Sequence, residues 1–198
     1  MSETSRLLRS DAWAHRISPL QNEAEIPRGG SVSDNPTSHS QRQLVQPEGN
    51  LREAQMLTHV EFRSDCFPPY DGEEQEINRD LWGKRLAEFL RDGLRAEGIE
   101  TTEPVPEDWG WMLPTLNQDF QLWIGCGHYQ EYPDGFLCFI EPHEPYIRKF
   151  VKKIDTREKV SQLQQAMDKV LAENAGIRDK RWWTFEEFNQ PGGTKPAR

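Results

Sequence analysis

Residues 108–142 read DWGWMLPTLNQDFQLWIGCGHYQEYPDGFLCFIEP, and this stretch decides the fold of the chain. It contains three segments rich in aromatic and aliphatic residues, DWGWMLPTL, DFQLWIGCGHYQ and DGFLCFIEP, a composition typical of β-strands. The segments are separated by LNQ and by EYPDG, and Pro133, Asp134 and Gly135 in the second separator favour a tight turn. Three strands that follow one another with such turns predict an antiparallel meander.

Upstream of the meander, the sequence predicts one strand and one helix. THVEFRSD (58–65) alternates apolar with polar residues, which is typical of a half-buried strand. INRDLWGKRLAEFLRDGLRAEG (77–98) places leucines and aromatic residues at helical spacing. We expect Asn78 to cap the amino end of this helix and Gly98 to end it in a left-handed conformation.

Downstream of the meander, IDTREKVSQLQQAMDKVLAENAG (154–176) predicts a second helix. Asp155 and Glu158 have the spacing of a capping box, and Gly176 is expected to close the helix. Its apolar stripe consists of Val160, Leu163, Met167, Val170 and Leu171.

The following stretch, IRDKRWWTFEEF (177–188), predicts a short extended piece and then one helical turn capped by Thr184 and Glu187. The resulting order is β-α-β-β-β-α with a short terminal element. This order predicts an α+β fold, a two-layer sandwich of a mostly antiparallel sheet and two helices.

Composition divides the chain into three parts. The first fifty residues contain one aromatic residue, Trp13, and the other nineteen of the twenty lie downstream. Because so few large apolar groups do not offset the entropy of ordering a chain, we expect residues 1–55 to form a disordered leader. Residues 56–190 are expected to form a single α+β domain, and residues 191–198 a flexible tail.

No segment approaches the ~20 apolar residues that a membrane helix needs, and no apolar run near the amino terminus resembles a secretory signal. We therefore expect a cytoplasmic protein with no membrane partner. Cys66, Cys126 and Cys138 form no familiar disulfide framework, so reduced thiols are expected. No motif in the sequence indicates a cofactor.

The stretch PEDWGWML (106–113) admits two interpretations. Alternation along a strand would place Trp109 and Trp111 on one face. The two tryptophans then either form core against the helices or anchor a contact surface, with Glu107 and Asp108 at its rim.

Charge is unevenly distributed along the chain, whose formal net charge is −9. Between Arg95 and Arg148 there is no Lys or Arg, whereas ten carboxylates occur: Glu97, Glu100, Glu103, Glu107, Asp108, Asp119, Glu131, Asp134, Glu141 and Glu144. Residues 148–183 carry ten basic residues against five acidic ones. Such a pattern indicates either a solvated surface with ion pairs between its halves, or an acidic sheet face that steers a basic partner.

Candidate chemistry is sparse. Cys126 and His128 share a strand face, and the following hairpin could bring Cys138 opposite them, with His143 beyond. This spacing is not that of a standard zinc site, so buried cysteines and a hydrogen-bonded histidine are the preferred interpretation and no metal ligand is assigned. Glu107 and Asp108 are neighbours on a strand and point to opposite faces, which argues against a carboxylate pair for acid–base catalysis.

Four stretches together resemble a group of small bacterial hypothetical proteins of no assigned activity, over roughly residues 59–188. They are FPPYDGEEQEINRDLWGKRLAEFLRDGL, PEDWGW, LWIGCGHYQEYPDGFLCFIEP and RWWTFEEF. This resemblance implies no catalytic residues. More loosely, a compact acidic α+β domain rich in tryptophan is similar to the immunity proteins that neutralise bacterial toxins, many of which are acidic folds that mask basic nucleases.

We therefore expect a protein-binding module rather than an enzyme, with a basic protein such as a toxin as its partner. The acidic, Trp-containing sheet face is expected to bind through Glu107, Asp108, Trp109, Trp111, Glu131 and Asp134. One alternative is an enzyme of unrecognised type, such as a hydrolase assisted by a metal at Cys126, His128 and His143. Another is an RNA-binding domain that uses RKFVKKIDTREK (148–159), against which the net charge and the acidic sheet argue.

Overall fold

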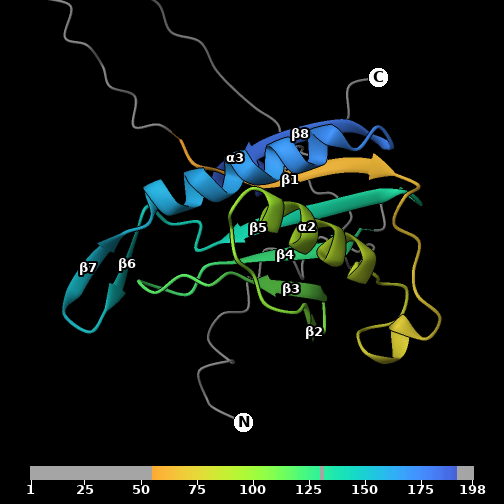
Figure 1. The fold of residues 1–198 in the computed structure, drawn as a ribbon, viewed down its shortest axis with the longest axis horizontal. Coiled ribbons are helices and arrows are strands. Elements are labelled where there is room, and N and C mark those ends of the chain that lie inside the picture. The colour runs from red at the N-terminus through yellow and green to blue at the C-terminus, as the bar shows by residue number, and fades with distance from the viewer. Residues whose placement is uncertain (1–54, 130–131, 191–198) are drawn as a thin grey trace, which may run out of the picture.

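The computed structural model describes residues 55–129 and 132–190 of the chain. It confirms an α+β fold in which a mostly antiparallel six-stranded sheet packs against two helices (Figure 1). The expected leader, apart from Gln55, and the expected tail lie outside the described residues.

The six strands of the sheet pair in the order β2-β3-β4-β5-β1-β8, and every neighbouring pair is antiparallel. The strands are β2 (Val105–Glu107), β3 (Gly110–Pro114), β4 (Trp123–His128), β5 (Gly135–Glu141), β1 (Leu57–Ser64) and β8 (Ile177–Thr184). The predicted meander is therefore present as β3, β4 and β5. The upstream strand β1 pairs with its last strand rather than its first, since Val60 lies opposite Cys138.

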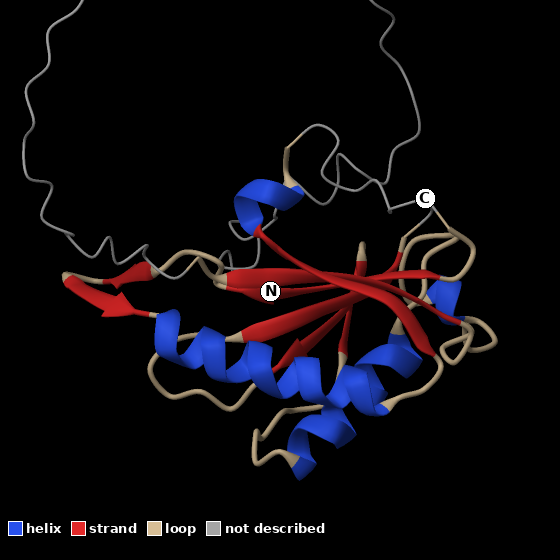
Figure 2. Ribbon diagram, turned by 90° about the horizontal axis from the view of Figure 1, so that it is seen from above, coloured by secondary structure: helices blue, strands red, loops and turns tan. Residues whose placement is uncertain are grey.

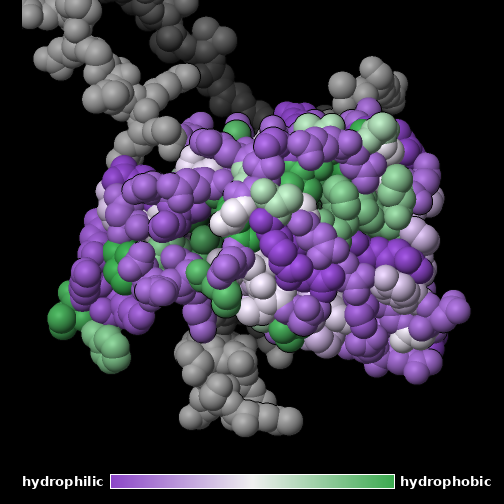
Figure 3. Space-filling view, in the orientation of Figure 1, coloured by the Kyte–Doolittle hydropathy of each residue, from purple (hydrophilic) through white to green (hydrophobic). Residues whose placement is uncertain are grey.

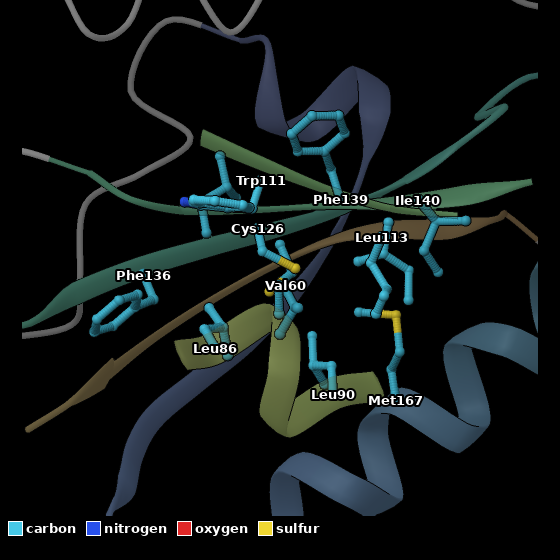
Figure 4. Packing of buried hydrophobic residues seen from close by; sticks show 14 of the residues in the cluster. Val60, Leu86, Leu90, Trp111, Leu113, Cys126, Phe136, Phe139, Ile140 and Met167 are labelled. Atoms are coloured by element: carbon cyan, nitrogen blue, oxygen red, sulfur yellow. The ribbon is translucent and has the colours of Figure 1, made fainter. Parts of the chain in front are cut away.

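Both long helices, α2 (Lys84–Ala96) and α3 (Arg157–Glu173), lie on the same face of the sheet (Figure 2). All five residues of the apolar stripe predicted for the second helix are buried. Alternate residues of the central strands point at the helices, so that Val60 and Leu113 face Leu90 and Met167 (Figure 4). We refer to this side of the sheet as the helix face.

The helix α2 begins five residues later than a cap at Asn78 predicts, because its cap comes from another part of the chain. Gly83 and Lys84 donate their backbone N–H groups to Oε1 of the buried Glu73, each at 2.8 Å. Glu73 opens a short 3-10 helix, η2 (Glu73–Gln75). Asn78 is not the cap, and its side chain instead donates to the backbone carbonyl of Asp108. The Glu73 carboxylate also lies at the positive end of the helix dipole, which a negative charge stabilises.

The expected capping box of the second helix is also absent. Thr156 is the residue before α3 and makes no side-chain cap. The Asp155 carboxylate instead accepts from the backbone N–H and the guanidinium of Arg157, at 3.0 Å in each case, and these bonds lower the pKa of Asp155 to about 2. The α3 helix ends at Glu173, before Gly176, whereas α2 is followed by Gly98 at φ 78°, as expected.

The chain after the meander contains more strand than the pattern predicted. β6 (Tyr146–Lys149) and β7 (Lys152–Asp155) form a separate hairpin that projects beyond the sheet (Figure 1). The extended piece after α3 is the edge strand β8. The short helix α4 (Phe185–Phe188) follows it and has the predicted capping box between Thr184 and Glu187.

Two glycines allow the chain to approach the carbonyl of Cys126 closely. A Cβ atom added at either Gly83 or Gly110 would lie 2.7 Å from that carbonyl oxygen. Gly110 also has φ 148°, which other residues rarely adopt. The turn before β3 and the start of α2 therefore meet over the same point of β4.

Candidate functional site

The structure does not gather the six predicted binding residues into one patch. Glu107 and Asp108 lie at the turn between β2 and β3, whereas Asp134 lies in the β4–β5 turn. Asp134 forms ion pairs with Arg63, at 2.9 Å, and with Arg178, and chiefly its hydrogen bond to Arg63 lowers the pKa of its carboxyl. Glu131 lies outside the described residues.

The two tryptophans of PEDWGWML point to opposite faces of the sheet. Trp111 is 1% exposed and lies in the core on the helix face, with the Lys84 ammonium 4.5 Å from its ring centroid. Trp109 precedes β3, is half-buried, and packs on Trp123 and Phe139. Phe139 lies on the side of the sheet away from Leu113 (Figure 4). The expectation that both tryptophans share a face fails because Trp109 lies outside the strand, in the turn that precedes Gly110.

A continuous row of rings covers the face of the sheet away from α2 and α3. We refer to it as the aromatic row. Its members, in order, are Trp123, Trp109, Phe139, His59, Phe185 and His143, with Phe188 as a further member that stacks beside them on His59. Adjacent centroids are 3.6–5.9 Å apart. The residues come from β1, β4, β5, α4 and the loops at both ends of the meander.

Sequence reasoning missed five members of this row. The alternation in LWIGCGH and GFLCFIE contains the signal, since Trp123 and Phe139 are out of phase with the core residues Ile124, Cys126 and Ile140. The contribution of α4 could not be read in the same way, because it depends on how the chain returns over β1 after β8.

The end of β5 and the loop that follows it bring one imidazole and two carboxylates together at one end of the row. Nδ1 of His143 lies 2.9 Å from Oε1 of Glu141, and its Nε2 lies 3.7 Å from Oε1 of Glu144. Phe185 stacks on the imidazole with a centroid distance of 3.6 Å. Burial lowers the pKa of His143, but the hydrogen bond and charge of Glu141, with the charges of Glu144 and Glu186, outweigh it and leave the pKa raised.

These three residues are the one group of three metal-ligating side chains within residues 55–129 and 132–190. One ligand atom from each of Glu141, His143 and Glu144 lies within 4.8 Å of the others. Imidazole together with carboxylates suits zinc and other divalent transition metals. The arrangement can also hold a proton on His143 between two carboxylates.

The metal ligands considered from the sequence do not come together. Cys126 and Cys138 are opposite each other across β4 and β5, as expected, but both are completely buried, and burial is the main cause of the strongly raised pKa of Cys138. His128 stacks on Trp82, its Nε2 lies 3.1 Å from the carbonyl of Tyr132, and burial lowers its pKa. His128 pairs with Phe136 near the start of β5, whereas His143 comes after the last residue of that strand. A metal site at Cys126, His128 and His143 is therefore wrong.

Some of the ten carboxylates pair with cations from outside their own stretch. Glu97 pairs with Lys169 at 2.6 Å, and Glu103 pairs with Arg91 at 2.5 Å. The Glu97–Lys169 and Asp134–Arg178 pairs agree with the interpretation of ion pairs between the acidic and basic parts, whereas Arg91 and Arg63 lie upstream of both parts. Glu141 and Glu144 differ, because their partner is the imidazole of His143.

Among the described residues, no helix is both long and apolar enough to cross a membrane. Comparison of the chain with protein-family models, with curated proteins and with solved structures found no match.

Proposed function

We propose that this protein is a binding module that binds a basic protein on the acidic half of its sheet. In this proposal it acts as an immunity protein, and the basic partner is the toxin that it neutralises. The supporting observation is that β2 to β5 all come from a stretch without Lys or Arg. Glu97, Glu103 and Asp134 are paired with Lys or Arg from elsewhere, so a cationic partner would meet negative charge chiefly at Glu141 and Glu144, whose ion-pair partner is His143. Such a field accelerates association and favours a basic partner over an acidic one.

The contact would centre on Trp123 and the neighbouring Glu141 and Glu144. Trp123 lies opposite Glu141 across β4 and β5 and is half-buried. A half-buried tryptophan beside carboxylates can contribute apolar area, a ring face for Arg or Lys, and an indole N–H donor. Trp109 keeps its predicted role as an anchor in this proposal, and Trp123 takes the place of Trp111.

The second candidate function is a metal-assisted enzyme. The observation in its favour is the approach of Glu141, His143 and Glu144 to within 4.8 Å of one another. A metal held there would act as a Lewis acid or activate water. Elemental analysis of untagged protein distinguishes the candidates, since stoichiometric metal that is lost in His143→Gln favours the enzyme.

The binding proposal is tested by selecting a phage-displayed library of basic protein domains on the immobilised full-length chain. Selected domains should bind more slowly as salt rises, because screening weakens the steering field. Trp123→Ala should mainly speed dissociation, and Glu144→Lys should mainly slow association.

The matched charge control is Glu173→Lys, which makes the same change at the end of α3, on the other side of the sheet. If Glu173→Lys slows association as much as Glu144→Lys, the effect is one of net charge and the proposed face is wrong. Selected domains that are insensitive to both Trp123→Ala and Glu144→Lys would also contradict the proposal.

A further inference from the structure

The hairpin of β6 and β7 ends in an apolar pair that packs against nothing. Phe150 and Val151 form its turn and are 97% and 104% exposed, more than any other large apolar residue in the described part of the chain. Figure 3 shows hydrophobic side chains at the end of the arm that Figure 1 draws as β6 and β7. Adjacent apolar side chains at the extremity of a projection are exposed to water at a cost that only a partner removes.

Four basic residues occupy the two cross-strand pairs next to this turn. Arg148 lies opposite Lys153 and Lys149 lies opposite Lys152 in the register of the two strands. Like charges directly opposite each other destabilise a hairpin. Repulsion between these cations therefore destabilises the hairpin on its own, and binding of anions from a partner would relieve that repulsion.

No carboxylate within residues 55–129 and 132–190 forms an ion pair with any of these four cations. The Lys153 ammonium lies 3.6 Å from the ring centroid of Tyr146, and the Lys149 ammonium donates to the backbone carbonyl of Asp119 at 3.4 Å. Neither contact is with a carboxylate, although the charge of Lys153 helps to lower the pKa of Asp155 at the other end of β7. Arg148 and Lys152 are exposed.

We propose that the β6–β7 hairpin is a membrane-contact arm for bilayers that carry anionic phospholipids. Phe150 and Val151 insert at the boundary between headgroups and acyl chains, and the four cations contact the lipid phosphates behind them. This combination of a small apolar insertion with a basic collar is how peripheral proteins adsorb to anionic leaflets. It replaces the expectation of no membrane partner, which followed from the absence of a membrane-spanning segment.

The length of the arm lets an acidic protein approach a surface of its own sign. Strands of four residues extend about 13 Å at ~3.3 Å per residue. Charges separated by more than about 8 Å are largely screened at physiological salt. The tip can therefore touch the bilayer while the carboxylates of β2 to β5 remain beyond the range of strong repulsion, whereas Asp119, whose backbone carbonyl contacts Lys149, lies closer to the tip.

A bilayer fits these residues better than a nucleic acid does. The cations occupy only two successive cross-strand pairs, whereas a nucleic acid presents phosphates along its whole length and would continue onto the acidic body. Phosphate contacts give no role to Phe150 and Val151. An anionic bilayer would contact both the apolar pair and the four cations at the tip of the hairpin.

The test is sedimentation of the full-length protein with phosphatidylcholine vesicles that contain or lack phosphatidylserine. We expect binding to the anionic vesicles alone, decreasing as salt rises. Phe150→Ser with Val151→Ser should weaken binding by about tenfold or more through lost apolar insertion. Lys149→Gln with Lys152→Gln should weaken it by a similar factor and flatten its salt dependence.

Matched controls change residues of the same kind away from the hairpin, namely Leu116→Ser, at a leucine that is 61% exposed, and Lys159→Gln on α3. Both should bind as the parent does, and thermal melts should show every variant folded. Equal binding to neutral vesicles, no binding, or no loss in the Phe150 and Val151 variant overturns the proposal. Tighter binding to a short double-stranded RNA than to anionic vesicles would also overturn it and assign the hairpin to nucleic acid.

Discussion

The two faces of the six-stranded sheet are built from different chemical groups. On the helix face, Val60, Leu113 and Ile140 are completely buried against α2 and α3. On the other face, the aromatic row combines half-buried tryptophans with two histidines and ends at Glu141 and Glu144. The difference indicates that the helix face provides stability, while groups able to bind or titrate are concentrated on the other.

The largest effect is expected from the two tryptophans that the turn at Gly110 sends to different faces. Trp111→Ala should destabilise the protein by about 3–5 kcal/mol, because it empties core volume on the helix face. Trp109→Ala should cost about half of that or less, since its side chain is only partly buried. Urea unfolding of both variants measures the difference, and equal losses would remove the distinction between the faces.

A smaller loss of stability is expected when the cap of α2 is removed, because packing on the helix face depends on the position of that helix. Glu73→Ala leaves the N–H groups of Gly83, Lys84 and Tyr70 without their carboxylate acceptor, at a cost of about 1–3 kcal/mol. Asn78→Ala serves as the control, since Asn78 is not the cap. Chemical denaturation with a helix-sensitive probe should show the larger loss in Glu73→Ala; the reverse order would contradict the capping role.

The smallest effects should come from the histidines, and they should have opposite signs on the two faces. His128 on the helix face has a lowered pKa, so its contribution to stability is present above its unfolded pKa and is lost as pH falls toward its folded value. His143 has a raised pKa, so its contribution is present below its unfolded pKa and is lost as pH rises through its folded value.

Proton NMR titration between about pH 5 and 8 should therefore find His143 titrating above, and His128 below, the ordinary histidine range. His143→Gln assigns one resonance and should destabilise the protein more at the acidic end of that range than at the alkaline end. A loss that grows as pH rises would show that Glu141 does not stabilise the imidazolium.

Periodicity predicted the helix face well, because its residues repeat at the spacings of the elements that carry them. The stripe of α3 and the alternation of Ile124 and Cys126 are local patterns. The beginning of α2 was not predictable in this way, since Glu73 lies in a separate 3-10 helix. Local propensity gives no account of a cap delivered by a loop.

The candidate site was predicted less well because it depends on tertiary placement. The acidic stretch was visible in the sequence, but the alternation rule assigned Trp109 to the face of Trp111. The hairpin of β6 and β7 was missed as a strand pair because RKFVKK does not alternate apolar with polar residues. Its separation from the main sheet also required knowledge of where α3 begins.

The carbonyl oxygen of Cys126 limits how this chain can be diversified. Because Gly83 and Gly110 both face that one oxygen at 2.7 Å from a would-be Cβ, a library that randomises either position should return glycine almost alone. A second substitution on β4 offers no relief, since the obstructing atom belongs to the backbone. Distant relatives that keep this fold should therefore be recognisable by two glycines, one before the first long helix and one at the start of β3, even where the aromatic row has changed.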